Sequence, residues 1–293
     1  MSTQHGWLLL LLPFFSLASY GQTVPERIEY CGMELTLTPG ARAKIAEYVE
    51  TMYISPRYFN DMVRRADTYM PIIEEGLVNV RAPLDLRFIA IQESGLRPDA
   101  VSTSNAVGFW QFKEPVAIEM GLQVNEWIDE RKHIFRASEA AGAYFAKGNR
   151  DFDNWVYGVI AYYEGPTGAI RYTDPDYYGK KEMLITEDTH WYVLKAIAHK
   201  LAYEEAIAIR KQPEIWLLPR STQGDVSIKK LCQEYGIDEP LFFQYNQWLR
   251  DPKRLPAGAS YTCYIPRNGA SYAGHIPDPN KAPGGGRPGP VLV

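Results

Sequence analysis

One carboxylic acid, near the end of a predicted helix, has a position suited to acid–base chemistry. The segment from Ala82 to Gly95 carries a proline near its start and ends on a glycine, which predicts a helix of about three turns. Glu93 falls in the last turn, on or beside the face that Ile89 is expected to bury. Partial burial and the negative end of the helix dipole both disfavour the charged carboxylate, so we expect a raised pKa for Glu93. Such an acid can protonate a glycosidic oxygen; the alternative, for an isolated glutamate, is that it points into solvent.

Three later segments give this carboxylic acid a context. They are Asn105–Phe112, with Gly108, Trp110 and Gln111; Ala161–Gly165, with Tyr162, Tyr163 and Glu164; and Thr189–Lys195, with Tyr192. In order and separation, these segments and the pair Glu93–Ser94 resemble the four motifs of family 1 lytic transglycosylases, most closely the membrane-bound D branch. The stretches Asp129–Arg131 and Ser138–Ala141 are also similar to that branch. The resemblance covers roughly residues 55 to 205.

The resemblance implies a lysozyme-like helical domain that cleaves the β-1,4 bond between N-acetylmuramic acid and N-acetylglucosamine in peptidoglycan without water. Glu93 would first protonate the glycosidic oxygen, while the neighbouring N-acetyl group stabilises the charged sugar. Glu93 would then act as the base that takes the proton of the C6 hydroxyl, which closes a 1,6-anhydro ring. Most glycosidases use two carboxylates, and this family resembles the substrate-assisted exceptions. Ser94 would orient the substrate or the carboxyl group.

The resemblance also implies a set of substrate-binding residues. They are Ser94, Gly108, Trp110, Gln111, Tyr162, Tyr163 and Tyr192. Gly108 would let the backbone approach the cleft, Gln111 would hydrogen-bond the sugar, and Tyr162 would lie on the cleft wall. The hydroxyl of Tyr192 is expected to hydrogen-bond the catalytic carboxyl. For Trp110 and Tyr192 the alternative is a place in the hydrophobic core.

The third segment departs from the family pattern Ala-Tyr-Asn-x-Gly. Tyr163 stands at the asparagine position, so the usual amide contact is lost, and Glu164 follows it. Glu164 would be a second carboxylate near the cleft, which permits ordinary hydrolysis; a solvated loop glutamate is the alternative. Two rival functions therefore stay open: a hydrolytic muramidase, and a catalytically inactive cell-wall binding or scaffold protein.

Helical spacing surrounds these motifs. Prolines near the first turn, followed by apolar residues three and four apart, predict helices over residues 39–53 and 56–75. Between residues 83 and 203 no stretch shows sustained alternation, so this domain is predicted to be all-α. Two β-prone stretches, 216–218 and 261–265, enclose two short helical patterns. The predicted fold class is mainly α, with a lysozyme-like helical catalytic domain followed by a small βααβ module.

The C-terminal module resembles a LysM domain, which binds chains of N-acetylglucosamine. The resemblance depends on Gly224–Asp225, Tyr235–Ile237, Leu255–Gly258 and Ile265–Pro266. The spacing departs from that family by roughly one extra residue in the first helix and two before the last strand. The alternative is a divergent module that packs on the catalytic domain without binding sugar. A sugar-binding attachment would raise the local concentration of an insoluble substrate.

These patterns predict the division of the chain. The predicted units are a signal peptide at 1–21, an N-terminal helical region at 22–80, the lytic transglycosylase domain at 81–212, the LysM-like module at 213–268 and a disordered Gly/Pro-rich tail at 269–293. The apolar run Trp7–Leu17, followed by small residues, predicts cleavage before Gln22 and export to the periplasm or cell envelope. An uncleaved anchor is the alternative, although the run is shorter than the roughly 20 residues that span a bilayer.

Composition narrows the classes of partner and cofactor. The net charge is -4 and Lys and Arg are scattered, which disfavours nucleic acid as a partner. His133, His190 and His199 stand apart and no HExxH pattern occurs, so we predict no metal and no cofactor. Cys232 and Cys263 lie in one module and are candidates for a disulfide, with three free thiols as the alternative. The expected partners are peptidoglycan glycan strands and other cell-envelope proteins.

Overall fold

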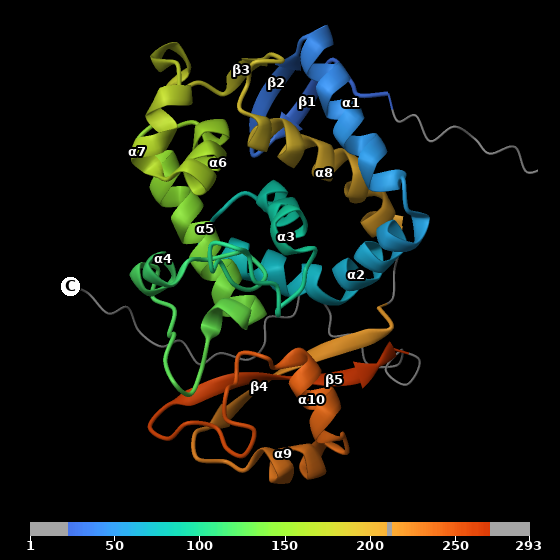
Figure 1. The fold of residues 1–293 in the computed structure, drawn as a ribbon, viewed down its shortest axis with the longest axis vertical. Coiled ribbons are helices and arrows are strands. Elements are labelled where there is room, and N and C mark those ends of the chain that lie inside the picture. Colours follow the sequence, from blue (N-terminus) through green and yellow to red (C-terminus); the bar gives the residue numbers. More distant parts are fainter. Residues whose placement is uncertain (1–22, 210–212, 270–293) are drawn as a thin grey trace, which may run out of the picture.

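The computed structural model describes residues 23–209 and 213–269. The predicted signal peptide lies outside these residues, and so does the predicted tail apart from Gly269. The described chain forms a larger, mostly helical part and a smaller part of two long strands and two helices (Figure 1). Within the described residues, no helix is long and apolar enough to cross a membrane.

The larger part is built mainly from helices. They are α1 (Pro39–Tyr53), α2 (Pro56–Asn79), α3 (Arg87–Ser94), α4 (Glu114–Glu119), α5 (Ile134–Arg150), α6 (Trp155–Glu164), α7 (Pro166–Ala169) and α8 (Trp191–Ile209). The hydroxyls of Thr38 and Ser55 accept hydrogen bonds from the first turns of α1 and α2, each of which begins at a proline. The prediction for residues 39–53 is confirmed, and the helix predicted over 56–75 continues for four more residues to Asn79.

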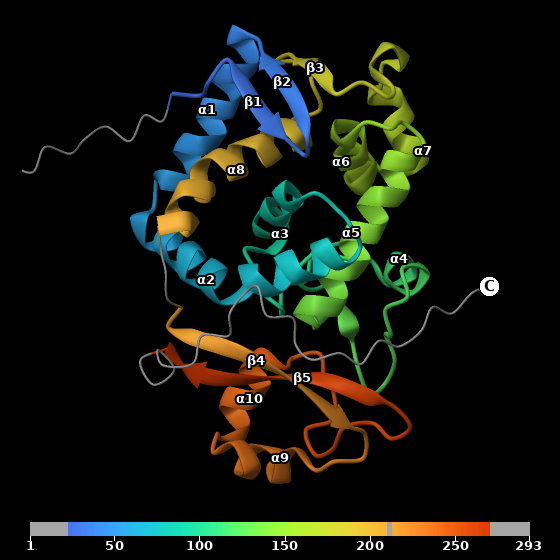
Figure 2. The ribbon, with the colours of Figure 1, turned by 180° about the vertical axis from the view of Figure 1, so that it is seen from behind.

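Helix α3 lies inside a ring formed by α1, α2, α5, α6 and α8 (Figures 1 and 2). A short 3-10 turn at Leu84–Leu86 leads into it, so the helix expected between Pro83 and Gly95 is present. Phe88, Ile89, Ala90 and Ile91 are four consecutive residues and all are buried, so the first part of the helix is enclosed on every side. Gly95 ends the helix in the left-handed conformation, with φ 60°. The last turn, which carries Glu93, therefore lies between this buried stretch and the Gly95 cap.

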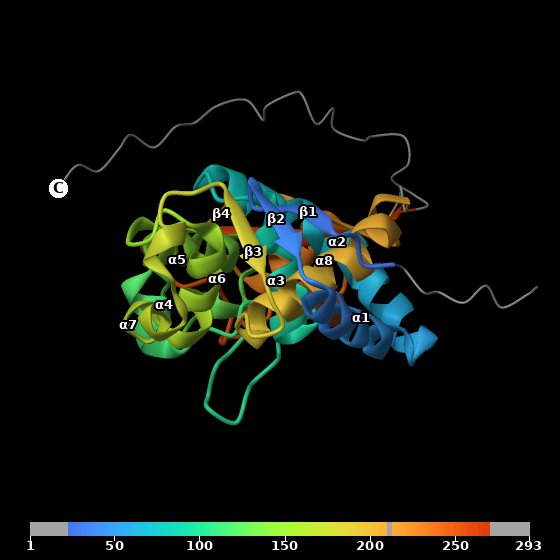
Figure 3. The ribbon, with the colours of Figure 1, turned by 90° about the horizontal axis from the view of Figure 1, so that it is seen from above.

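A three-stranded sheet corrects the all-α prediction for the larger part. Its strands are β1 (Arg27–Tyr30), β2 (Met33–Leu37) and β3 (Glu182–Ile185). Strands β1 and β2 form an antiparallel hairpin, and β2 pairs in parallel with β3, so β2 lies between the other two (Figure 3). Strand β3 alternates exposed and buried residues over only four positions, too few for its period to stand out. Residues 22–80 are thus not purely helical, and they share one hydrophobic core with α3 to α8.

The smaller part has the order strand, helix, helix, strand. Its elements are β4 (Ile215–Gln223), α9 (Ile228–Tyr235), α10 (Glu239–Tyr245) and β5 (Ser260–Asn268). Strands β4 and β5 pair antiparallel from Ile215↔Asn268 to Gln223↔Ser260. A second core under this sheet contains Cys232 and Cys263. Both are free thiols, as is Cys31, so the disulfide considered for this pair is not formed. The likeness to LysM domains stays a prediction.

A buried ion cluster joins the two parts. Arg131 donates two hydrogen bonds to the carboxylate of Asp129, each 2.8 Å long, and Arg250 of the smaller part donates a third at 3.0 Å. Burial favours a higher pKa for Asp129, but the hydrogen bonds from Arg131 and Arg250 outweigh it and lower that pKa. Nearby, a ring nitrogen of His133 lies 2.9 Å from the carbonyl oxygen of Thr262. The stretch that resembled the D branch therefore anchors the C-terminal module.

Candidate active site

Glu93 lies in the last turn of α3, half-buried, with its carboxyl held by one strong contact. The hydroxyl of Tyr192 donates a hydrogen bond of 2.6 Å to Oε1 of Glu93, the contact that the family resemblance implied. Burial raises the pKa of Glu93, although the Tyr192 hydrogen bond and the charge of Lys195 act in the opposite direction. The expected direction of this pKa shift is confirmed. A carboxyl group in this state can donate a proton at a pH where an ordinary glutamate is ionised.

Two cavities meet at Glu93. The α6 cavity, of about 560 Å³, is lined by Glu93, Ser102, Gln111, Phe112, Tyr144, Tyr162, Tyr163 and Glu164, among others. The α2 cavity, of about 740 Å³, is lined by Glu93, Ser102, Gln111, Tyr58, Arg65, Arg97, Lys195 and His199, among others. Because Glu93, Ser102 and Gln111 belong to both, the carboxyl lies in the middle of a continuous depression. An extended ligand can therefore occupy both sides of the acid.

Three tyrosines lie beside Glu93, and two of them, Tyr162 and Tyr163, line the α6 cavity. Tyr192 is buried, whereas Tyr163 is half-exposed and stacks on the Tyr192 ring with centroids 4.9 Å apart. Tyr162 donates a hydrogen bond of 2.6 Å to the carbonyl oxygen of Trp110, and its ring stacks on Phe145 at 4.1 Å. Tyr162 thus lines the α6 cavity, and its contact with a substrate stays a prediction. Tyr163 offers an aromatic face to the same cavity.

Gln111 and Ser94 are held by the backbone around the acid. Gln111 has φ 50°, and its side-chain nitrogen donates to the carbonyl oxygens of Gly108 at 2.9 Å and Ala100 at 3.1 Å. Among the described residues no donor contacts its amide oxygen, and the residue lines both cavities. The hydroxyl of Ser94 donates at 2.8 Å to the carbonyl oxygen of Phe109. Ser94 therefore ties the end of α3 to the Gln111 turn; the hydrogen bond that orients the Glu93 carboxyl comes from Tyr192.

Two predicted substrate contacts are wrong. The side chain of Trp110 is fully buried and donates a hydrogen bond of 3.0 Å to the hydroxyl of Ser138, so it belongs to the core. Gly108 has φ +84°, and a Cβ at this position would lie 2.0 Å from the carbonyl oxygen of Arg131. The backbone that Gly108 approaches is therefore that of Arg131, in the 3-10 turn Glu130–Lys132, and not the cleft. Both residues shape the turn that carries Gln111 without facing the cavities.

Glu164, the last residue of α6, lines the same cavity as Glu93 and is one-fifth exposed. A ring nitrogen of His190 lies 3.2 Å from Oε1 of Glu164, and the Arg171 guanidinium lies 3.5 Å from Oε2. It is therefore not a solvated loop glutamate. A second carboxylate does line the candidate site, held between two basic groups.

Sequence reasoning missed Lys195 and considered His190 only as a metal ligand. Lys195 lies three residues after Tyr192 on α8, so both point to the same side of the helix. That spacing was a usable signal once Tyr192 had been paired with Glu93. The sequence held no signal that pairs His190 with Glu164, because Glu164 lies on α6, far from His190 in the sequence. Among the described residues, no group of three or more His, Cys, Asp or Glu is arranged to hold a metal ion.

Comparisons with known proteins found one matching family model and several similar sequences. The family model described as "Transglycosylase SLT domain" matches residues 71–185, which include Glu93 and the segments around Gln111 and Tyr162. The chain is similar to the "Membrane-bound lytic murein transglycosylase D" of Escherichia coli K12 and of Escherichia coli O6:H1, 26% identical over 178 residues in each case, covering 58% of this chain and 39% of the relative. It is also similar to a "Putative tributyltin chloride resistance protein" of Alteromonas sp. strain M-1, 25% identical over 108 residues, covering 36% of this chain and 52% of the relative. The chain thus matches about two fifths of the length of the murein transglycosylases.

Proposed function

We propose that this chain is a peptidoglycan lytic transglycosylase, which cleaves the β-1,4 bond between N-acetylmuramic acid and N-acetylglucosamine and leaves a 1,6-anhydromuramoyl end. The observation that carries the proposal is Glu93 itself: a carboxyl of raised pKa, hydrogen-bonded by Tyr192, at the meeting point of two cavities. The match of residues 71–185 to the SLT domain supports the same reaction class.

In the first step, Glu93 transfers its proton to the glycosidic oxygen. Tyr192 occupies Oε1, so the transferred proton is carried on Oε2. The bond between C1 and that oxygen then breaks, and the substrate's own N-acetyl group stabilises the positive charge on the sugar. The carboxylate left behind is stabilised by the Tyr192 hydroxyl and by the charge of Lys195, both of which favour the ionised form of Glu93.

In the second step, the Glu93 carboxylate takes the proton of the C6 hydroxyl. The C6 oxygen forms a bond to C1 and closes the anhydro ring, so the acid is restored and no water is consumed. Gln111 offers its amide oxygen to hydroxyl or amide donors of the sugar, and Tyr162 and Tyr163 offer the wall of the α6 cavity. Stacking of a sugar ring on the half-exposed Tyr163 suits its aromatic face.

Digestion of purified peptidoglycan, followed by mass spectrometry of the released fragments, tests this proposal. Wild-type protein is expected to release fragments with anhydro ends, and Glu93→Gln is expected to release none. Fragments that carry an added water would refute the non-hydrolytic route. If wild-type protein binds peptidoglycan but releases nothing, the chain is a cell-wall binding or scaffold protein.

A hydrolytic muramidase is the second candidate, because Glu164 lines the α6 cavity together with Glu93. Hydrolysis would need Glu164 to activate a water, but its carboxylate oxygens already contact His190 and Arg171. Glu164→Gln separates the two routes. A transglycosylase is expected to keep its anhydro products in this variant, whereas a hydrolase that uses Glu164 as its base would lose the hydrated products.

We further propose that the C-terminal module binds N-acetylglucosamine chains in the manner of a LysM domain, and that the protein is exported to the cell envelope. The strand–helix–helix–strand order supports the first proposal, and the apolar run near the N-terminus supports the second. Competition by N-acetylglucosamine oligomers, in a pull-down of Glu93→Gln with peptidoglycan, tests the binding. Fractionation of the source cells tests the export.

A further inference from the structure

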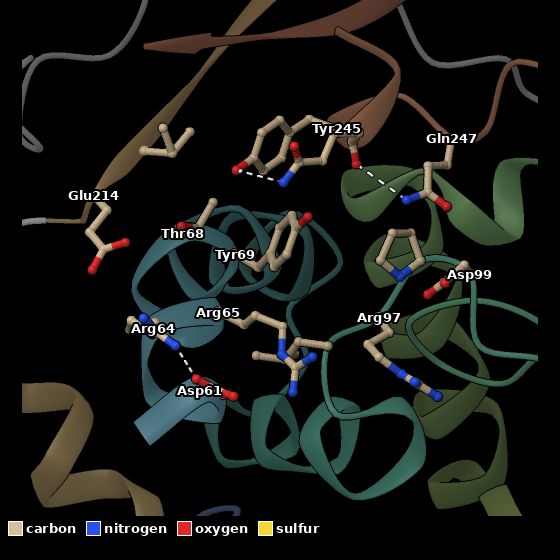
Figure 4. Close-up of a pocket in the computed structure, with 14 residues that line it drawn as sticks. Asp61, Arg64, Arg65, Thr68, Tyr69, Arg97, Asp99, Glu214, Tyr245 and Gln247 are labelled. Atoms are coloured by element: carbon tan, nitrogen blue, oxygen red, sulfur yellow. Dashed lines mark hydrogen bonds and ion pairs between the residues drawn. The ribbon is translucent and has the colours of Figure 1, made fainter. Parts of the chain in front are cut away.

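A third cavity, of about 450 Å³, lies where the helical part meets the C-terminal module (Figure 4). Helix α2 and the loop after α3 form one side, and the start of β4 and the end of α10 form the other. The rings of Tyr69 and Tyr245, one from each part, approach to 6.3 Å between centroids. We call this space the junction cavity.

The junction cavity continues the depression that contains Glu93. Asp61, Arg65 and Arg97 line both the junction cavity and the α2 cavity. A ligand that crosses Glu93 can therefore send a branch past these three side chains toward the C-terminal module.

Two guanidinium groups on this path have donors to spare. The Nε of Arg65 is buried and has no hydrogen-bond partner among the described residues, and its Nη2 contacts only the sulfur of Met62, at 3.9 Å. Arg97 is exposed on the shared wall, and Figure 4 draws no bond from either guanidinium to the other described residues that line the cavity. Arg64, in contrast, is paired with Asp61.

The remaining charges narrow the class of ligand. Asp99 and Glu214 also line the junction cavity, so its surface offers carboxylates as well as the free guanidinium groups of Arg65 and Arg97. Guanidinium groups match carboxylates in a planar, two-point geometry, and the two carboxylates match an amino group. The complement is a short peptide that carries both free carboxylates and an amine.

We propose that the junction cavity binds the peptide stem of the strand whose glycan lies across Glu93, with Arg65 and Arg97 holding its carboxylates. The inference rests on the proposed function, since the muramoyl residue next to the cleaved bond is the sugar that carries a peptide. Gln247, from the C-terminal module, adds a neutral hydrogen-bonding side chain to the same cavity. Arg65 and Arg97 are then specificity residues, which select peptide-bearing strands.

The test compares the binding of two ligands to a variant that cannot cleave them. In Glu93→Gln protein, calorimetry measures the affinity for a peptide-bearing disaccharide and for the same disaccharide after an amidase has removed the peptide. The selectivity is the ratio of the two affinities. Arg97→Gln is the first variant, since an exposed side chain can be changed without unfolding, and Arg65→Lys is the second. Arg57→Gln, on the same helix α2 and also exposed, is the matched control because Arg57 lines none of these three cavities.

We expect Arg97→Gln to lower the selectivity about tenfold, the loss typical of one charge-assisted contact, and Arg57→Gln to leave it unchanged. Equal affinities of the Glu93→Gln protein for the two ligands, or an unchanged selectivity in both Arg97→Gln and Arg65→Lys, would overturn the inference. Digestion by the wild-type protein is scored separately. Absence of any cleavage refutes the proposed function, while the binding ratio still reports on the junction cavity.

Discussion

Replacing Tyr192 with phenylalanine removes one atom from the candidate site and tests how Glu93 is controlled. The hydroxyl donates the 2.6 Å hydrogen bond to Oε1, in a buried environment. A hydrogen bond to a charged group contributes about 1.5–3 kcal/mol. The contact strengthens as Glu93 becomes a carboxylate, so the loss falls on the transition state. We therefore expect kcat to drop between about tenfold and a hundredfold, with little change in KM.

The same substitution has a definite effect on the pH profile. Glu93 must be protonated for the first step, so activity falls as pH rises through its pKa. The Tyr192 hydroxyl favours the ionised form, and its removal raises the pKa of Glu93 further. The falling, alkaline limb of kcat/KM is expected to move to higher pH in Tyr192→Phe.

A matched control separates this effect from a general loss of stability. Tyr157 is also buried, and its hydroxyl hydrogen-bonds the backbone of Asp174, away from the three cavities. Tyr157→Phe makes the same chemical change and should leave the pH profile in place. The reasoning is refuted if Tyr192→Phe keeps the wild-type kcat, or if its alkaline limb moves to lower pH.

Three further predictions concern stability. The folded-state pKa of Glu93 is raised, so its contribution to stability is fully present below the unfolded pKa and is lost as pH rises through the folded pKa. The melting temperature of Glu93→Gln, relative to that of wild type, should therefore increase with pH. Gly108→Ala should lower the free energy of unfolding, measured by denaturant titration, by about 2 kcal/mol or more. The reason is that φ is positive and the new Cβ would lie 2.0 Å from the Arg131 carbonyl oxygen. Gly121→Ala is the control, since Gly121 also has a positive φ but has open space around it. For Asp129, whose pKa is lowered, the stabilisation is present above the unfolded pKa and is lost as pH falls through the folded pKa; protease resistance of the C-terminal module should fall in acid, and in Arg250→Ala it should be reduced already at neutral pH.

The sequence predicted the helices around the site well because their signals are local. Prolines at the first turn and capping hydroxyls at Thr38 and Ser55 fix where α1 and α2 begin. Gly95 fixes where α3 ends, and with it the position of Glu93. Strand β3 escaped prediction for the opposite reason. Its four residues become a strand only by pairing with β2, which lies next to it in space but much earlier in the sequence.

The site residues divide along the same line. Glu93 and Tyr192 were predicted as partners, and their hydrogen bond is present. Trp110 and Gly108 were assigned to the substrate because a motif says which residues occur together, not which way each one faces. Their orientation depends on Ser138 and Arg131, which lie on other segments. A motif therefore locates a site better than it assigns roles within it.

The position of Tyr163 beside Tyr192 bears directly on the choice between the two proposed reactions. The Tyr163 ring stacks on Tyr192, which hydrogen-bonds Glu93, and Tyr163 and Glu93 line the same cavity, so an aromatic face lies close to the acid. Hydrolysis needs an ordered water and a base beside C1, whereas ring closure by the C6 hydroxyl needs only the Glu93 carboxylate. An aromatic ring close to the acid disfavours an ordered water and does not hinder ring closure by the C6 hydroxyl. Tyr163→Asn should therefore shift the products toward hydrated ends, as measured by mass spectrometry of the released fragments.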